Sequence, residues 1–204
     1  MDKRIKTVPE EKGYTLILAS SSPRRKTLLQ EYGLSFRILT APAEEISIAG
    51  DGEGTVKRNA YHKAEKVLSL LRENSPAEYE KSIVIGADTV IEASGKVLGK
   101  PSDKTHAEEM LLSLAGRTHK VITGVALLSA HREVIFAVTT FVTFHPLSLP
   151  EIRSYMEKVH VLDKAGAYAA QEHGEMIIEK MDGSMENVVG LPVQEILEEL
   201  QGRW

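Results

Sequence analysis

The stretch Ile83-Val84-Ile85-Gly86-Ala87-Asp88-Thr89-Val90-Ile91 is the most hydrophobic part of this sequence. A short apolar run rich in β-branched residues is typical of a strand buried inside a sheet. One acid, Asp88, interrupts the run. An unpaired buried carboxylate is costly, so Asp88 should meet a metal ion or cation, or else cap a turn or pair with a lysine.

Strands and helices alternate on both sides of this stretch. Apolar alternation and helical spacing predict strands over residues 14–19, 36–39, 83–91, 121–128, 134–144, 165–171 and 175–181, and helices over 24–32, 55–71, 107–114, 149–159 and 192–201. The polar turn at 130–133 joins two of these strands into a long antiparallel hairpin. Interleaved helices and hairpins together predict an α/β fold, a mixed sheet covered by helices and pinched into two lobes.

Composition excludes several classes of protein. The 204 residues are 42% hydrophobic and 26% charged, which is ordinary globular usage, and no run is long and apolar enough to cross a membrane. The absence of cysteine excludes disulfides, thiolate catalysis and zinc-thiolate sites, and it fits a cytoplasmic location. A net charge of −4 argues against nucleic acid as a partner. Residues 1–13 are expected to be an N-terminal extension, and residues 14–204 a single domain.

The first candidate site is the strand-to-helix turn Ser20-Ser21-Ser22-Pro23-Arg24-Arg25. A helix N-terminus offers unpaired N–H groups and a positive dipole end, and guanidinium groups match phosphate oxygens bidentately. This turn is therefore expected to bind phosphate. The alternative is a capped helix with two solvated arginines.

A second group of candidates is acidic and lysine-rich. Asp88 and the loop pair Glu44-Glu45 offer the hard oxygen ligands that magnesium uses when it also contacts substrate phosphates. Lys63 falls at the edge of its helix's apolar stripe, and Lys100 lies in a loop after a glycine, so either ammonium could face phosphate. The alternatives are a solvated acidic pair and two surface lysines.

Taken together, six motifs resemble those of the Maf family over roughly residues 14–200. They are Leu18-Ala19-Ser20-Ser21-Ser22-Pro23-Arg24-Arg25, Gly86-Ala87-Asp88-Thr89-Val90, Gly99-Lys100-Pro101, Thr123-Gly124-Val125, Asp163-Lys164-Ala165-Gly166-Ala167-Tyr168 and Asn187-Val188-Val189-Gly190-Leu191-Pro192. The resemblance implies an elongated, twisted mixed sheet with a cleft between two lobes, as in inosine triphosphate pyrophosphatases. It also implies a nucleoside triphosphate pyrophosphatase, which releases pyrophosphate and leaves the monophosphate.

The resemblance also implies roles for individual residues. Asp88, Lys63 and Lys100 would be catalytic, with Asp88 as the proton acceptor, and Glu45 and Asp88 would hold a divalent cation, Mg²⁺ or Mn²⁺. Substrate binding would fall to the serines, arginines and specificity positions Ser20, Ser22, Arg24, Arg25, Thr89 and Gln171.

The family branch is indicated by a single glutamine. Members acting on dTTP and UTP carry a glutamine after the Ala-Gly-Ala-Tyr motif, and Gln171 occupies that place, although Glu172-His173 replaces the usual following glycine. The family also suggests a homodimer. Two other readings remain open: a non-catalytic regulator of septum formation acting through protein contacts, and a nucleotide-sugar or phosphate-ester enzyme using the same phosphate cradle.

Overall fold

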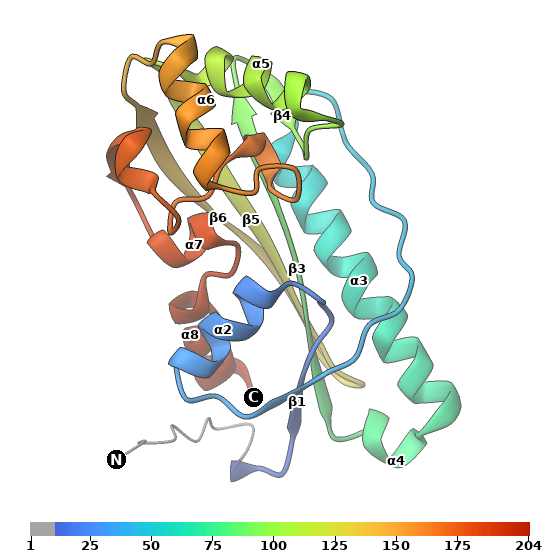
Figure 1. Ribbon diagram of the computed structural model, residues 1–204. Coiled ribbons are helices and arrows are strands. Elements are labelled where there is room, and N and C mark those ends of the chain that lie inside the picture. Colours follow the sequence, from blue (N-terminus) through green and yellow to red (C-terminus); the bar gives the residue numbers. More distant parts are fainter. Residues whose placement is uncertain (1–10) are drawn as a thin grey trace.

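The computed structural model describes residues 11–204, so most of the predicted N-terminal extension, residues 1–10, lies outside the described part (Figure 1). The strands are β1 (Thr15–Leu18), β2 (Phe36–Ile38), β3 (Ser82–Ala93), β4 (Lys96–Leu98), β5 (Thr118–Leu128), β6 (Glu133–Phe144) and β7 (Ile178–Asp182). The helices are α2 (Pro23–Glu31), α3 (Gly52–Asn74), α4 (Pro76–Tyr79), α5 (Lys104–Leu114), α6 (Leu149–Lys158), α7 (Met185–Val189) and α8 (Val193–Arg203), with 3₁₀ turns η1 (Ala165–Ala167) and η2 (Gly174–Met176).

The sheet is mixed, as predicted, and it is open with seven strands. Its order is β2-β1-β3-β5-β6-β7, with β4 paired to the far end of β3. Strand β1 runs parallel to β2 and β3, whereas β3, β5, β6 and β7 are antiparallel neighbours. The predicted central strand is therefore the one on which the parallel and antiparallel halves meet.

Alternate residues of the central strands point to opposite faces of the sheet. On β3, Val84 packs in the core beneath α3, while Ile83 and Ile85 pack in the core beneath α2 and α8. Helix α3 lies very close to the sheet, because a Cβ on Gly86 would come within 2.1 Å of the Ala60 carbonyl oxygen. A glycine at this position lets the backbones of helix and strand touch.

Two lobes follow from two separate cores on the α2 face. One core lies under α2 and α8, and the other lies under α5 and α6, at the opposite end of the long strands β5 and β6 (Figure 1). The predicted elongated α/β fold with two lobes is thus confirmed. Within residues 11–204 no helix is both long and apolar enough to cross a bilayer.

The segment after α6 departs from prediction. Residues 165–171 do not form a strand: Gly166 and Ala167 have positive φ, at 64° and 62°, and make the turn η1. The Gly166 amide donates to the Gly99 carbonyl at 2.9 Å, so the segment folds over the end of β3 instead of joining the sheet. The strand predicted over 175–181 begins only at Ile178, after η2.

Helix boundaries differ less from prediction. Helix α3 starts at Gly52, three residues before the predicted start, because the Asp51 side chain accepts from the Gly54 amide and caps it. Helix α2 has Ser22 as its N-cap residue, Pro23 in its first turn and Gly33 beyond its end with a φ of 68°. The Ser22 side chain, however, makes no capping hydrogen bond.

Candidate active site

A gap in the sheet beside β3 forms the floor of the site. Strand β1 pairs with β3 only as far as Ile85, and β4 pairs with it only from Ile91. Between them, within the described residues, positions 86–90 of β3 have no strand on that side. Side chains from both faces can therefore reach one space, and a crevice beyond the carboxyl end of a parallel strand is a common place for ligands.

Arg25, from the first turn of α2, crosses this gap. Its Nη1 donates to the Ala87 carbonyl at 2.9 Å and to the Ser20 Oγ at 3.2 Å, its Nη2 to the Thr89 Oγ1 at 3.2 Å, and its Nε to the Gly190 carbonyl at 2.8 Å. The guanidinium thus satisfies one backbone carbonyl and one side-chain hydroxyl on the unpaired edge of β3. A guanidinium has five N–H groups, so the bonds to described residues leave one, on Nη2, for a substrate phosphate.

Across the gap, two carboxylates share one ammonium. The Lys63 Nζ lies 2.7 Å from the Asp88 Oδ1 and 2.6 Å from the Glu45 Oε1. Asp88 is 8% exposed, whereas Glu45 is exposed in the loop before α3. The hydrogen bond from Lys63 holds the pKa of Glu45 below its ordinary value, so this carboxyl is ionised at neutral pH.

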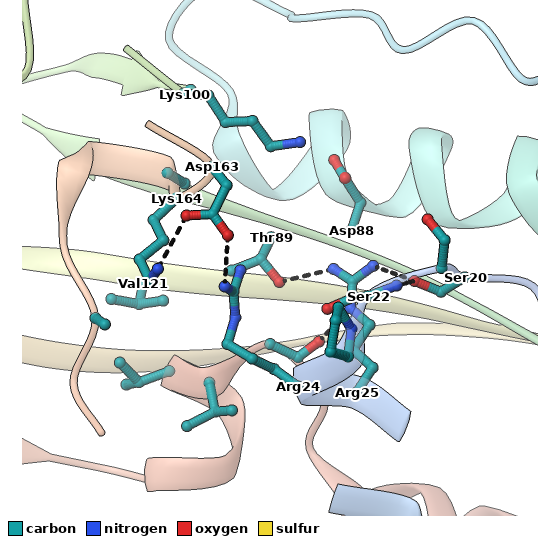
Figure 2. A pocket seen from close by; sticks show the side chains of 18 of the residues that line it. Ser20, Ser22, Arg24, Arg25, Asp88, Thr89, Lys100, Val121, Asp163 and Lys164 are labelled. Carbon is teal, nitrogen blue, oxygen red and sulfur yellow. Dashed lines mark hydrogen bonds and ion pairs between the residues drawn. The ribbon is translucent and has the colours of Figure 1, made fainter. Parts of the chain in front are cut away.

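A second ion pair lies at the rim. The Arg24 Nη1 is 3.2 Å from the Asp163 Oδ2, and the Lys164 Nζ is 2.9 Å from the Asp163 Oδ1 (Figure 2). Partial burial raises the pKa of Asp163, but Lys164 and Arg24 together hold it below its ordinary value. Figure 2 also shows the Lys100 side chain reaching into the same space as Asp88.

The third wall belongs to the α5–α6 lobe. It is made largely of the irregular segment 168–172, with Tyr168 buried and Gln171 exposed on a turn. Behind it, the Tyr168 hydroxyl lies 2.9 Å from the Nε2 of buried His119. The walls enclose a cavity of about 680 Å³, within the size range of pockets for small molecules.

All ten residues predicted for the site line this one cavity: Ser20, Ser22, Arg24, Arg25, Glu45, Lys63, Asp88, Thr89, Lys100 and Gln171. Their individual roles stay predictions. Sequence reasoning missed Asn59, whose amide contacts Asp88, although its position one helical turn before Lys63 places both on one helix face. It also gave no role to Asp163, which pairs with Arg24.

The acidic pair fits a cation that arrives with its substrate. Residues 11–204 hold no group of three or more acidic, histidine or cysteine side chains suited to a metal ion. Magnesium, however, commonly uses one or two carboxylates and completes its shell with substrate phosphates and water. Glu45 and Asp88, from two segments of the chain, are the two carboxylates that would hold such a cation.

A family model and individual relatives both match this chain along almost its whole length. Residues 15–203 match the Maf-like protein family. A dTTP/UTP pyrophosphatase of Akkermansia muciniphila is 46% identical over 92% of this chain and 95% of its own length. Proteins of the same name from Bacillus velezensis and Symbiobacterium thermophilum are 42% and 41% identical, each over 91% of this chain and 95% and 92% of their own lengths. The chain therefore belongs to the Maf-like family.

Proposed function

We propose that this protein hydrolyses dTTP and UTP to the nucleoside monophosphate and pyrophosphate, and so removes these nucleotides from the cellular pool. The observation that carries the proposal is that Arg24 and Arg25 on one wall and the Glu45–Lys63–Asp88 cluster on another face the same cavity. A triphosphate needs cations on several sides, because its own charge repels an incoming nucleophile. The names of the relatives described above support the same activity.

In the reaction, a water molecule attacks the α-phosphorus. A new P–O bond forms, the bond from the α-phosphorus to the oxygen that bridges to the β-phosphorus breaks, and pyrophosphate leaves with that oxygen. Asp88 would accept the proton from the water, through a lone pair not used by Lys63 or Asn59. General-base catalysis of this kind contributes about 10²- to 10⁴-fold.

The cationic side chains stabilise the charge that develops on the leaving group. Lys63 is fixed by two carboxylates, and the Arg25 guanidinium is held by bonds to Ser20, before α2, and to Ala87, on β3, so neither needs to reorganise during the reaction. Lys100, which is exposed, and Arg24, which is half-buried, line the cavity and would close on the phosphates. A divalent cation, Mg²⁺ or Mn²⁺, held by Glu45 and Asp88, would add charge neutralisation and Lewis-acid polarisation of a phosphate oxygen.

Selection of the base would depend on the third wall, residues 168–172. The Gln171 amide offers both donors and an acceptor, which complement the imide edge of thymine and uracil, whereas cytosine reverses part of that pattern. The cytoplasmic location and the homodimer stay predictions and are not needed for this chemistry.

A screen of nucleoside triphosphates with pyrophosphate detection, with and without Mg²⁺ or Mn²⁺, tests the proposal. We expect pyrophosphate from dTTP and UTP, slower release from CTP, and little activity without a divalent cation. Release of orthophosphate in place of pyrophosphate would favour the phosphate-ester alternative. No release from any nucleotide would leave the non-catalytic regulator as the better reading.

A further inference from the structure

Asn59, on α3, is 3% exposed, and its side chain makes three hydrogen bonds to other described residues. Buried amides are retained in proteins where their donors and acceptors are satisfied. The partners of this one are a loop backbone and a catalytic carboxylate, which belong to different parts of the site.

Two of the bonds hold the loop that carries Glu45. The Ile46 amide donates to the Asn59 Oδ1 at 2.9 Å, and the Asn59 Nδ2 donates back to the Ile46 carbonyl at 2.9 Å. This reciprocal pair fixes both polar backbone groups of the residue next to Glu45. The loop lies outside any helix or strand, so these bonds stand in for secondary structure at that point.

The third bond reaches Asp88. The second N–H of the same Nδ2 donates to the Asp88 Oδ2 at 2.9 Å, while Lys63, one helical turn further along α3, takes the other oxygen. The close approach of α3 to β3 at Gly86, two residues before Asp88, brings the helix within reach of Asp88. One amide therefore touches the loop of one acid and the carboxylate of the other.

We infer that Asn59 is a positioning residue that sets the separation of Glu45 and Asp88, and hence their placement around a cation and the reacting α-phosphate. The inference rests on the proposed function. A rigid shell of hydrogen bonds is what keeps reacting groups within a fraction of an ångström of a productive arrangement.

The chain offers a matched control one turn earlier on the same helix. The Thr55 Oγ1 accepts from the Ile48 amide at 2.9 Å, so Thr55 also ties down this loop, but it does not contact either acid. If Asn59 only held the loop, its substitution would change kcat no more than substitution of Thr55. If Asn59 positions the acids, its substitution should lower kcat much more.

The experiment compares Asn59→Ala, Asn59→Ser and Thr55→Val with the wild type, each first shown by thermal unfolding to be folded at the assay temperature. At saturating Mg²⁺ we expect both Asn59 variants to lose about 10- to 100-fold in kcat for dTTP, because small displacements of reacting groups have effects of this size. The KM of the Asn59 variants should stay within about threefold, because ground-state binding of the substrate is unchanged. Thr55→Val should keep a near-normal kcat, because Thr55 does not contact either acid.

A second readout does not use turnover. Binding of the non-hydrolysable α,β-imido analogue of dUTP, measured by calorimetry across a Mg²⁺ series, should need at least about fivefold more Mg²⁺ for half-maximal effect in the Asn59 variants, since the shell that orients cation ligands is lost. Thr55→Val should match the wild type. Asn59 variants with wild-type kcat and Mg²⁺ dependence, or a Thr55→Val variant equally impaired, would overturn the inference. A wild type that releases no pyrophosphate would overturn the proposed function instead, and the analogue titration would then decide the role of Asn59.

Discussion

The two walls that carry Arg25 and Asp88, together called the phosphate wall, differ in construction from the third wall, residues 168–172, called the base wall. On the phosphate wall, Arg25 and Asp88 come from a helix start and a central strand, and each is held by several hydrogen bonds to distant parts of the chain. On the base wall, Gln171 is exposed on a turn that belongs to neither helix nor strand. With the roles proposed above, the regular elements would hold the groups that act on the phosphates, and the choice of base would fall to a segment outside any helix or strand.

The largest expected effect comes from neutralising the acid on the phosphate wall. Asp88→Asn should lower kcat for dTTP by about 10³-fold, because it removes a proton acceptor and a cation ligand together. The amide is nearly the same size as the carboxylate, so circular dichroism and cooperative unfolding should remain those of a folded protein. Pyrophosphate release under single-turnover conditions measures the change.

The matched control is Glu44→Gln, which neutralises an exposed acid next to Glu45 that does not line the cavity. Its kcat should stay within about twofold of the wild type, because exposed charges outside the site contribute little. If the kcat of Asp88→Asn stayed within tenfold of the wild-type value, Asp88 would not be catalytic. Substitutions on the phosphate wall would then affect kcat no more than substitutions on the base wall.

The sequence predicted features that depend on local pattern, but not those that depend on contacts between distant residues. The hydrophobic run around Asp88 and the serine turn before α2 predicted the central strand and the helix start, because both depend on local pattern and capping chemistry. The bonds of Arg25 to Ala87 and Gly190 join residues that lie 62 and 165 positions apart, so no local pattern reveals them. The sequence therefore identified Arg25 as a candidate phosphate-binding cation, but it did not reveal that Arg25 hydrogen-bonds across the gap beside β3.

The base wall was harder to predict for a physical reason. Residues 165–171 have a strand-like composition, yet two consecutive residues, Gly166 and Ala167, take positive φ there. A left-handed alanine is unfavourable in isolation, and it persists where surrounding packing imposes it. Here Ala167 is fully buried in the core beneath α5 and α6. Tertiary packing overrides local propensity in this segment.

The next effect tests how firmly the base wall is anchored. His119 packs edge-on against Phe144 and Tyr168, with ring centroids 4.9 and 5.6 Å away, and burial lowers its pKa from 6.5 to about 4. The His119 imidazole therefore binds a proton near pH 6.5 in the unfolded chain, but only near pH 4 in the folded protein. Stability from this histidine is complete above pH 6.5 and is lost as the pH falls toward 4, by up to about 3 kcal/mol.

The measurement is urea unfolding at several pH values between 7 and 4.5 for the wild type and for His119→Gln. Glutamine can keep a hydrogen bond to the Tyr168 hydroxyl but does not titrate, so the variant should lose less stability over this interval. Carboxyls with lowered pKa, such as Glu45, contribute mainly at lower pH. Equal pH dependence in the two proteins would show that His119 is not held neutral by the fold.

The smallest effect is expected on the base wall itself. Gln171→Ala should reduce the preference for UTP over CTP, measured as a ratio of kcat/KM values, by about tenfold, which is the size of one hydrogen-bond discrimination. Its kcat for dTTP should stay within about threefold, since Gln171 does not contact the groups that hold Asp88. The matched control, Gln201→Ala, removes an exposed glutamine on α8 that does not line the cavity, and it should change neither quantity. Equal loss on every nucleotide would contradict the separation of the two walls, because a side chain that matters equally for all bases is acting on the phosphates they share.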